Sequence, residues 1–159
     1  AQVLVPIDRV RLRGAEIAAT VKVATGFDAY AGLGYTDSTI QRYAVDPGLV
    51  GNEAPYVPQT TINAGAQYRV PLAPGVNLFM RGDYRRLGRQ FWDPENTTAR
   101  SNVNLVDLRL GIELPERGLS LIGSLDNAFD EVYNSEYVLG GFAHPAPPRV
   151  WRLDLRYAF

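Results

Sequence analysis

The residues of this sequence that could act as acids, bases or metal ligands are few and scattered. His144 is the sole histidine, and cysteine is absent, so no second side chain of either type could share a metal ion with it. Two carboxylate pairs have a spacing suited to acid and base roles, namely Asp126 with Asp130 and Asp107 with Glu113. Asp107 and Glu113 belong to an arginine-rich strand face, where a lattice of opposite charges explains them better. We therefore expect no enzyme, no metal site and no cofactor.

Two long loops combine cations with aromatic side chains, which is a pattern suited to holding a large ligand. Segment 87–102 carries Arg89, Phe91 and Trp92, which we expect to be exposed, and segment 129–148 carries Tyr133, Tyr137, Phe142 and His144. Such clusters contact ligands through ring faces and charge, or they pack the loops against one another and line a membrane interface. The candidate ligand-binding residues are Arg89, Phe91, Trp92, Tyr137 and His144.

The composition is that of one ordinary globular domain. The 159 residues are 21% charged and 46% hydrophobic, and 16 Lys and Arg against 17 Asp and Glu give a formal net charge of -1. This balance excludes the basic field that nucleic-acid binding needs. No apolar stretch reaches the roughly 18 residues of a transmembrane helix. A membrane β-barrel stays open as an explanation, because only alternate residues of its strands face lipid.

Seven windows alternate between apolar and polar residues with the period of a β-strand. They are residues 10–23, 28–37, 60–70, 76–86, 103–114, 119–128 and 149–159. Most are about ten residues long, which is the length that crosses a bilayer at a tilt. In the first window the apolar phase slips near Arg13 and Gly14, which predicts a β-bulge there.

The connections between these windows alternate strictly between short and long. Segments 24–27, 71–75 and 115–118 are short, whereas 38–59, 87–102 and 129–148 are long. Outer-membrane barrels have short periplasmic turns and long extracellular loops, so the pattern places the C-terminus in the periplasm. Tyr35, Tyr84 and Trp151 then lie near the outer ends of the apolar face, and Tyr68, Tyr157 and Phe159 near the inner ends, as two aromatic girdles.

The opposite strand face carries arginines interleaved with aspartates. Its members are Arg69, Arg81, Arg85, Arg109, Arg152 and Arg156, with Asp83, Asp107 and Asp154. This pattern predicts a hydrated, mixed-charge barrel interior whose opposite charges pair across strands.

The last strand, RVWRLDLRYAF, has a distinct apolar face that ends on an aromatic residue. Its members are Trp151, Leu153, Leu155, Tyr157 and Phe159. This strand resembles the C-terminal assembly signal of bacterial outer-membrane barrels, although an amphipathic strand of a soluble sandwich has the same alternation.

The number of strands bears on whether the barrel is complete. Seven strands, with the first beginning on the outside, do not fit the even strand number of bacterial single-chain barrels. Gln2 to Val5 could be the top of an incoming strand. We therefore expect residues 1–159 to be the C-terminal strands of a larger all-β, transmembrane, antiparallel up-and-down barrel.

Several ordered segments resemble the C-terminal barrel region of TonB-dependent outer-membrane receptors. They are RGAEIAATVKVATGFDAYAGLGYTDSTI, GNEAPYVPQTTINAGAQYRVPL, DYRRLGRQFWDPENT, LDNAFDEVYNSEYV and PPRVWRLDLRYAF. Asn127 to Asp130, followed by Tyr133, is similar to the recurrent Asn-Leu-Phe-Asp turn of the family, with Ala128 in place of leucine. The plug domain, the box that engages TonB and most barrel strands have no counterpart in residues 1–159.

The resemblance implies a function and a set of partners. The parent protein would import a large scarce nutrient, such as a siderophore, a corrinoid or a glycan, across the outer membrane of a Gram-negative bacterium. Its partners would be outer-membrane lipid, the barrel-assembly machinery and, through the missing N-terminal part, the TonB energy-transducing complex. The inner charged wall would support the plug, and no nucleic acid would be bound.

Two other interpretations remain open from the sequence. A complete eight-stranded outer-membrane barrel with a structural or adhesive role would also suit a chain of this length. An outer-membrane lipase or protease would need a serine or aspartate paired with histidine at the outer rim, and a sole histidine disfavours it.

Overall fold

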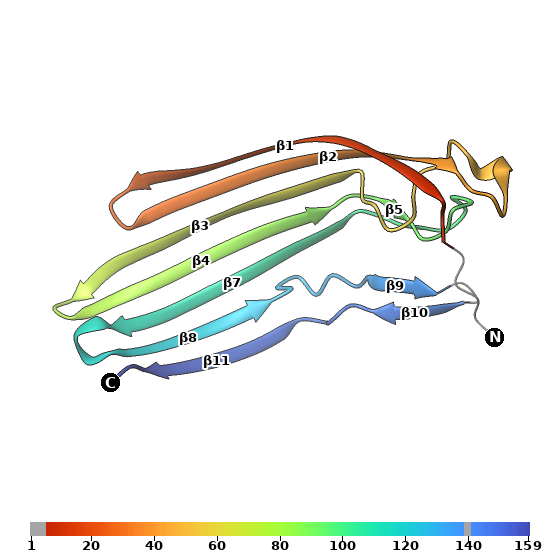
Figure 1. Cartoon of the computed structure of the whole chain (residues 1–159). Helices are drawn as coiled ribbons and strands as arrows, with labels where there is room; N and C mark the ends of the chain where they lie inside the picture. The colour runs from red at the N-terminus through yellow and green to blue at the C-terminus, as the bar shows by residue number, and fades with distance from the viewer. Residues whose placement is uncertain (1–5, 139–140) are drawn as a thin grey trace.

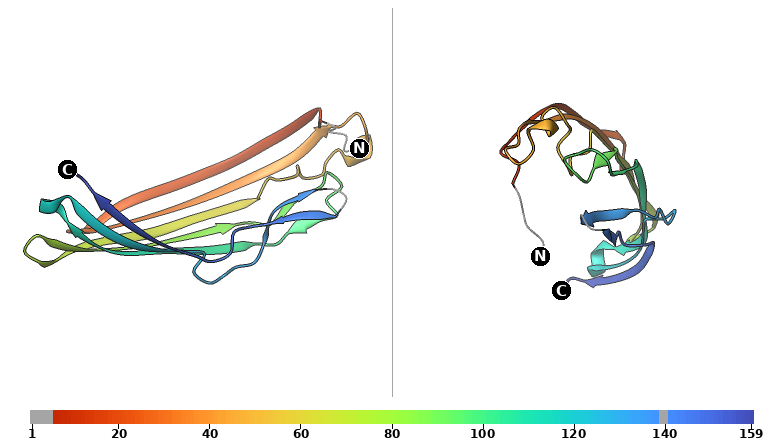
Figure 2. Two further views of the ribbon diagram at one scale, coloured as in Figure 1. Left: turned by 90° about the horizontal axis from the view of Figure 1, so that it is seen from below. Right: turned by 90° about the vertical axis from the view of Figure 1, so that its right-hand side faces the viewer.

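The computed structural model describes residues 6–138 and 141–159, and it shows one curved antiparallel sheet (Figures 1 and 2). The sheet strands are β1 (Arg9–Ala24), β2 (Phe27–Arg42), β3 (Thr60–Ala73), β4 (Val76–Leu87), β7 (Val103–Leu114), β8 (Leu119–Asp126) and β11 (Val150–Tyr157). They are hydrogen-bonded in the order β1-β2-β3-β4-β7-β8-β11, so each strand lies beside its neighbour along the chain. All seven predicted windows are thereby confirmed as strands. The segment Gln2 to Val5 lies outside the described residues.

Short turns gather at one end of the sheet and long loops at the other (Figure 1). The first long loop, residues 43–59, contains the short helix η1 (Pro47–Leu49), and the second, residues 88–102, contains β5 (Gln90–Phe91) and β6 (Ala99–Arg100). The third long loop, residues 127–149, contains the hairpin of β9 (Asn134–Val138) and β10 (Phe142–Pro145). The short helix η2 (Pro115–Arg117) lies in the short turn between β7 and β8. We call these two ends the long-loop end and the short-turn end.

The pairing register assigns every strand residue to the concave or the convex face. Tyr35 pairs with Ala15 on one side and Thr60 on the other, and Ile17 pairs with Leu33. These apolar positions lie on the convex face, where Ile17 is 70% and Leu155 is 72% exposed. A convex band of exposed large hydrophobic side chains has no place in a water-soluble sandwich, and it is what the lipid-facing surface of a barrel presents.

The buried side chains are concentrated near the long-loop end rather than in a central core. Ile40, Ala54, Trp92, Val103 and Leu105 are all buried, and Phe79 is buried toward the short-turn end. Ile40, Val103 and Leu105 occupy concave-face positions of β2 and β7. The hydrophobic packing of this chain therefore holds the long loops onto the sheet.

The predicted bulge near Arg13 and Gly14 is wrong. The pairing of β1 with β2 runs without a register shift from Val10 to Lys22, and Arg13 lies opposite Asp37. Strands β1 and β2 each run for 16 residues, longer than the roughly ten that cross a bilayer. The apolar phase of the sequence changes because both strands continue beyond the apolar band.

Within the described residues the sheet is open, and β1 and β11 are its two edge strands. The view along the strands shows an arc, as expected for part of a barrel wall (Figure 2). Among the same residues, no helix is long and apolar enough to cross a membrane.

Candidate functional site

The first and second long loops are bound to each other by the Asn96 side chain and by backbone contacts. The Asn96 side-chain oxygen accepts from the Glu53 backbone N–H at 2.8 Å, and its amide nitrogen donates to the Glu53 carbonyl at 2.9 Å. The Tyr56 backbone N–H donates to the Phe91 carbonyl at 2.8 Å. Asn96 has a φ of 59°, a left-handed conformation that asparagine tolerates well. The two loops thus form one preorganised unit.

Trp92 is the aromatic centre of this loop unit. Its ring centroid lies 5.1 Å from that of Tyr56, at an interplanar angle of 66°, and 6.5 Å from that of Tyr137 in the third long loop. The Tyr56 hydroxyl donates to the Tyr137 carbonyl, and the Arg100 guanidinium lies 5.9 Å from the Trp92 ring centroid. Trp92 is only 5% exposed, so the expectation that it is exposed is wrong. It joins all three long loops.

Asp93 fixes the turn that follows Trp92. Its carboxylate accepts from the Thr97 N–H at 2.8 Å, the Thr98 N–H at 2.7 Å and the Thr97 hydroxyl at 3.1 Å. Burial alone would raise the pKa of this carboxyl, but the hydrogen bonds from Thr97 and Thr98 outweigh burial and lower the pKa below its usual value. Asp93 is therefore a charged, buried support of the loop.

Arg89 and Phe91 form a second, more exposed pair in the same loop. The Arg89 guanidinium lies 4.4 Å from the Phe91 ring centroid and 3.8 Å from the Glu53 carboxylate. The Arg89 side chain remains 52% exposed. A cation held over a ring in this way presents unused N–H donors to solvent and to any anionic ligand.

His144 lies apart from these contacts, in the β9–β10 hairpin. It pairs with Glu136 across the hairpin, and its Nδ1 is 2.9 Å from the Glu136 carboxylate. The groups of His, Asp and Glu in the described residues include no cluster of three that could hold a metal ion. Of the five predicted residues, the structure joins Trp92 to Tyr137 and Arg89 to Phe91.

Tyr56, Asp93 and Asn96 are the most important site residues that were not predicted from the sequence. The segment from Asp93 to Asn96 reads Asp-Pro-Glu-Asn, a turn signal that could have identified the support residues. Tyr56 carries no such signal, because its role depends on a ring contributed by another loop.

The concave face carries the predicted mixed-charge wall. Arg81 donates to the Asp83 carboxylate through Nε and Nη2, each at 2.7 Å, and the Tyr30 hydroxyl donates to the same carboxylate at 2.6 Å. Near the short-turn end, Arg69 binds Glu113 at 2.6 Å and its guanidinium lies 5.1 Å from the Phe79 ring centroid. A hollow of about 470 Å³ lies on this face. Its polar lining includes Tyr30, Asn63, Arg81, Asp83, Arg85, Asp107 and Arg109.

The carboxylates considered above for acid and base roles all make structural contacts. Asp107 lies 3.9 Å from Arg85 and accepts from the Asn127 N–H at 2.9 Å, and Asp126 forms an ion pair with Arg152. Asp130 accepts from the Arg149 backbone N–H at 2.9 Å. Their contacts confirm that opposite charges pair across the concave face.

The Asn127 to Asp130 segment forms the turn at which β8 ends. Asn127 and Asp130 both have positive φ angles, of 50° and 57°. The Asn127 side chain accepts from the Glu131 N–H at 2.8 Å and donates to the Glu131 carbonyl at 3.0 Å. The side-chain hydrogen bonds of this segment therefore end strand β8 and fix the start of the third long loop.

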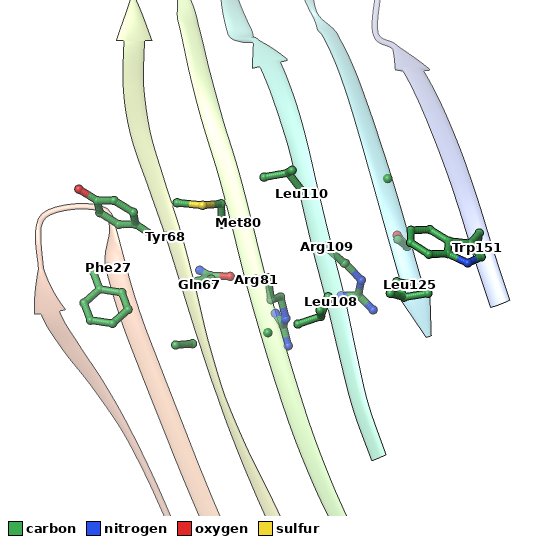
Figure 3. Close-up of a pocket in the computed structure, with 14 residues that line it drawn as sticks. Phe27, Gln67, Tyr68, Met80, Arg81, Leu108, Arg109, Leu110, Leu125 and Trp151 are labelled. Atoms are coloured by element: carbon green, nitrogen blue, oxygen red, sulfur yellow. The ribbon is translucent and has the colours of Figure 1, made fainter. Parts of the chain in front are cut away.

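An apolar groove of about 600 Å³ runs across the convex face (Figure 3). Its lining includes Phe27, Tyr68, Leu110 and Trp151, which Figure 3 labels. The small residues Ala66, Gly82 and Gly123 also line it. The groove lies within the apolar band, so lipid hydrocarbon fills it when the sheet stands in a bilayer.

The predicted assembly strand β11 is paired along its whole length with β8, from Val150 opposite Asp126 to Tyr157 opposite Leu119. Trp151, Leu153, Leu155 and Tyr157 lie on the convex face, and Phe159 follows the strand with its ring centroid 6.2 Å from that of Tyr157. The convex position of this row agrees with the face assigned from the sequence.

An open antiparallel meander with a convex apolar band and a concave charged wall defines part of a transmembrane β-barrel. The family model described as "TonB dependent receptor-like, beta-barrel" matches residues 2–128. The chain belongs to this family of TonB-dependent receptor β-barrels.

Solved structures of receptors share the fold. The ferric yersiniabactin uptake receptor FyuA from Yersinia pestis superposes with a TM-score of 0.83 at 21% identity, covering 94% of this chain and 24% of the receptor. The ferric preacinetobactin receptor BauA from Acinetobacter baumannii gives 0.80 at 20% identity, covering 92% and 22%. The siderophore receptor PiuA from the same organism gives 0.74 at 18% identity, covering 93% and 22%. The chain thus spans about a quarter of the length of these receptors.

Proposed function

We propose that residues 1–159 are the C-terminal barrel wall of an outer-membrane receptor that imports a ferric chelate. The observation that carries this proposal is the loop unit around Trp92, which joins three long loops at one end of a family barrel wall. The similar structures include receptors named for ferric yersiniabactin, ferric preacinetobactin and a siderophore, which favours a ferric chelate over a corrinoid or a glycan. The plug and the remaining strands would come from the rest of the receptor.

The proposed orientation places the long-loop end outside the cell and the C-terminus in the periplasm. Its support is the segregation of long loops and short turns to opposite ends of the sheet. In this orientation Tyr35, Tyr84 and Trp151 form the outer aromatic girdle. The concave charged wall would then face the plug, and the TonB complex would act through the N-terminal part of the receptor.

We assign ligand contact to the exposed members of the loop cluster and a supporting role to Trp92. Arg89 offers free N–H donors above Phe91, and ferric chelates with carboxylate or phenolate oxygens carry acceptors for them. The ring of Tyr137 lies beside that of Trp92, in the same loop cluster as Arg89. His144 would contact the ligand from the β9–β10 hairpin of the third long loop.

Uptake by cells that depend on this receptor tests the proposal. The probes are radioactive iron loaded on citrate, on one catecholate and on one hydroxamate, each supplied to a strain that lacks or carries the intact receptor. We expect receptor-dependent uptake of at least one probe, and Arg89→Ala should weaken it about tenfold by removing a charge-assisted contact. Arg117→Ala, at the short-turn end, is the matched control. If uptake of every iron chelate is independent of the receptor while a corrinoid or glycan is imported, the ferric assignment is wrong.

A further inference from the structure

The convex face carries charge at one end only. Across the seven sheet strands, its charged residues are five arginines and one aspartate: Arg9 with its cross-strand partner Arg42, Arg11, Arg13, Arg86 and Asp37. All six lie toward the long-loop end, beyond the Ala15–Tyr35 pair on β1 and β2 or beyond Tyr84 on β4. The convex positions nearer the short-turn end are apolar or small.

The register places the arginines of β1 at the edge of the apolar band. Convex positions from Ala15 to Val23 extend over about 27 Å of strand, which at the usual tilt covers about 20 Å of the roughly 25 Å apolar height of a membrane barrel. Arg13 is the next convex residue, about 7 Å along the strand beyond Ala15, and Arg11 follows it. These guanidinium groups therefore lie at the level of the lipid headgroups, on the side that faces lipid.

This patch has more positive charge than its neighbours neutralise. Arg11 lies 3.9 Å from the Asp37 carboxylate and donates to the Thr39 hydroxyl at 3.2 Å. Among the described residues, Asp37 is the one carboxylate on the convex face of these strands, set against Arg9, Arg11 and Arg13. An open hollow of about 490 Å³ next to Arg9 is lined in part by Thr39, Gln41 and Arg42.

We propose that Arg9, Arg11 and Arg13, with Thr39, bind the phosphate of an anionic lipid headgroup in the leaflet at the long-loop end. The argument is charge complementarity at the depth where headgroups lie, because arginine forms paired hydrogen bonds with phosphate and juxtamembrane cations attract anionic lipid. Lipid filling the apolar band below would hold the acyl chains of the same molecule. The inference rests on the proposed membrane placement, and it adds a lipid site distinct from the loop cluster.

Lipid retention by the intact receptor tests this site. The probes are lipid A with its two phosphates and the same lipid with the phosphates removed, each added to purified receptor in a neutral detergent and measured by native mass spectrometry. We expect R11Q/R13Q to retain phosphorylated lipid A roughly 30-fold less well, at about 1 kcal/mol for each lost arginine. R11K/R13K should bind phosphorylated lipid A better than R11Q/R13Q and less well than the unaltered receptor, because it keeps the charge but loses the paired hydrogen bonds of the guanidinium groups.

The control K22Q/R117Q removes the same charge at the short-turn end and should bind lipid A normally. Equal retention by R11Q/R13Q and the control, or equal retention of the dephosphorylated lipid by the unaltered receptor, would overturn the proposal, as would full displacement by millimolar inorganic phosphate. If R11Q/R13Q does not fold, as judged by heat-modifiable gel mobility, the comparison of the two lipids on the unaltered receptor still decides the matter. Iron uptake measured in parallel separates the two proposals, since normal uptake with no phosphate-dependent lipid retention would defeat only the lipid site.

Discussion

The rings of Trp92 and Tyr56 meet edge to face, with centroids 5.1 Å apart, although they belong to different long loops. Tyr56 also donates through its hydroxyl to the Tyr137 carbonyl of the third loop. The contact makes one buried aromatic side chain responsible for the arrangement of three loops. A receptor that captures a large ligand with loops gains affinity when those loops are ordered beforehand, because less conformational entropy is lost on binding.

Trp92→Ala should loosen the loop unit while leaving the barrel wall intact. Truncating a buried tryptophan costs about 3–5 kcal/mol, and here we expect this loss to lower the free energy of local opening of the loops. We expect faster proteolysis within the second long loop and weaker ligand binding, with unchanged heat-modifiable gel mobility. Phe142→Ala, at a side chain that is 71% exposed, is the control and should leave proteolysis unchanged. Equal protease resistance of the Trp92 variant and the unaltered receptor would contradict the role assigned to this ring.

Asp93 should make the order of the second long loop depend on pH. Its pKa is lowered by its hydrogen bonds, so its charge stabilises the loop above the usual value of 3.8, and this stabilisation is lost as the pH falls through the lower, folded value. The difference in tryptophan fluorescence between the receptor and its Trp92→Phe variant should stay constant near neutral pH and change in acid.

Asp93→Asn should remove this acid transition and destabilise the loop by about 2 kcal/mol at neutral pH, because it loses the charge that strengthens the bonds to Thr97 and Thr98. Glu95→Gln, two residues along the chain, keeps these bonds and should preserve the transition. If the acid transition persisted unchanged in Asp93→Asn, another carboxyl group would be responsible for it.

The faces of the strands were readable from the sequence, whereas the loop contacts were not. Alternation with period two assigns Ile17 and Leu33 to the same convex face without knowledge of any partner, and the structure agrees. The same alternation gave a false bulge at Arg13, because a strand that leaves the apolar band changes the chemistry of its face without changing its register. Trp92 was expected to be exposed because its partners come from two other loops, and no local pattern in the sequence encodes such a packing.

Gly65→Ala should disturb the concave wall. A β-carbon at this position would lie 2.5 Å from Cε1 of Tyr30 and 2.8 Å from a carboxylate oxygen of Asp83, so the hydrogen-bonded pair would have to shift. Overpacking of this kind costs about 1–3 kcal/mol. Gly123→Ala is a matched control in β8, since its β-carbon would meet only the Leu110 carbonyl oxygen, at 3.7 Å. Denaturant unfolding of the receptor in detergent should show a lower midpoint for the Gly65 variant alone, and equal midpoints for both would be the contrary result.

Phe159→Ala should reduce the amount of assembled receptor without changing the barrel that does form. Phe159 is fully exposed and follows β11, and its nearest aromatic neighbour is Tyr157, at 6.2 Å between ring centroids. A side chain with so little packing has little effect on the stability of the finished wall, so a large loss on truncation would have to arise during assembly. We expect several-fold less receptor in the outer-membrane fraction by immunoblot, with normal unfolding of the purified remainder. Val132→Ala, another exposed apolar truncation in the third long loop, should leave the yield unchanged. A normal yield for Phe159→Ala, or a lowered unfolding midpoint in the remainder, would show that the terminal aromatic residue is not an assembly signal.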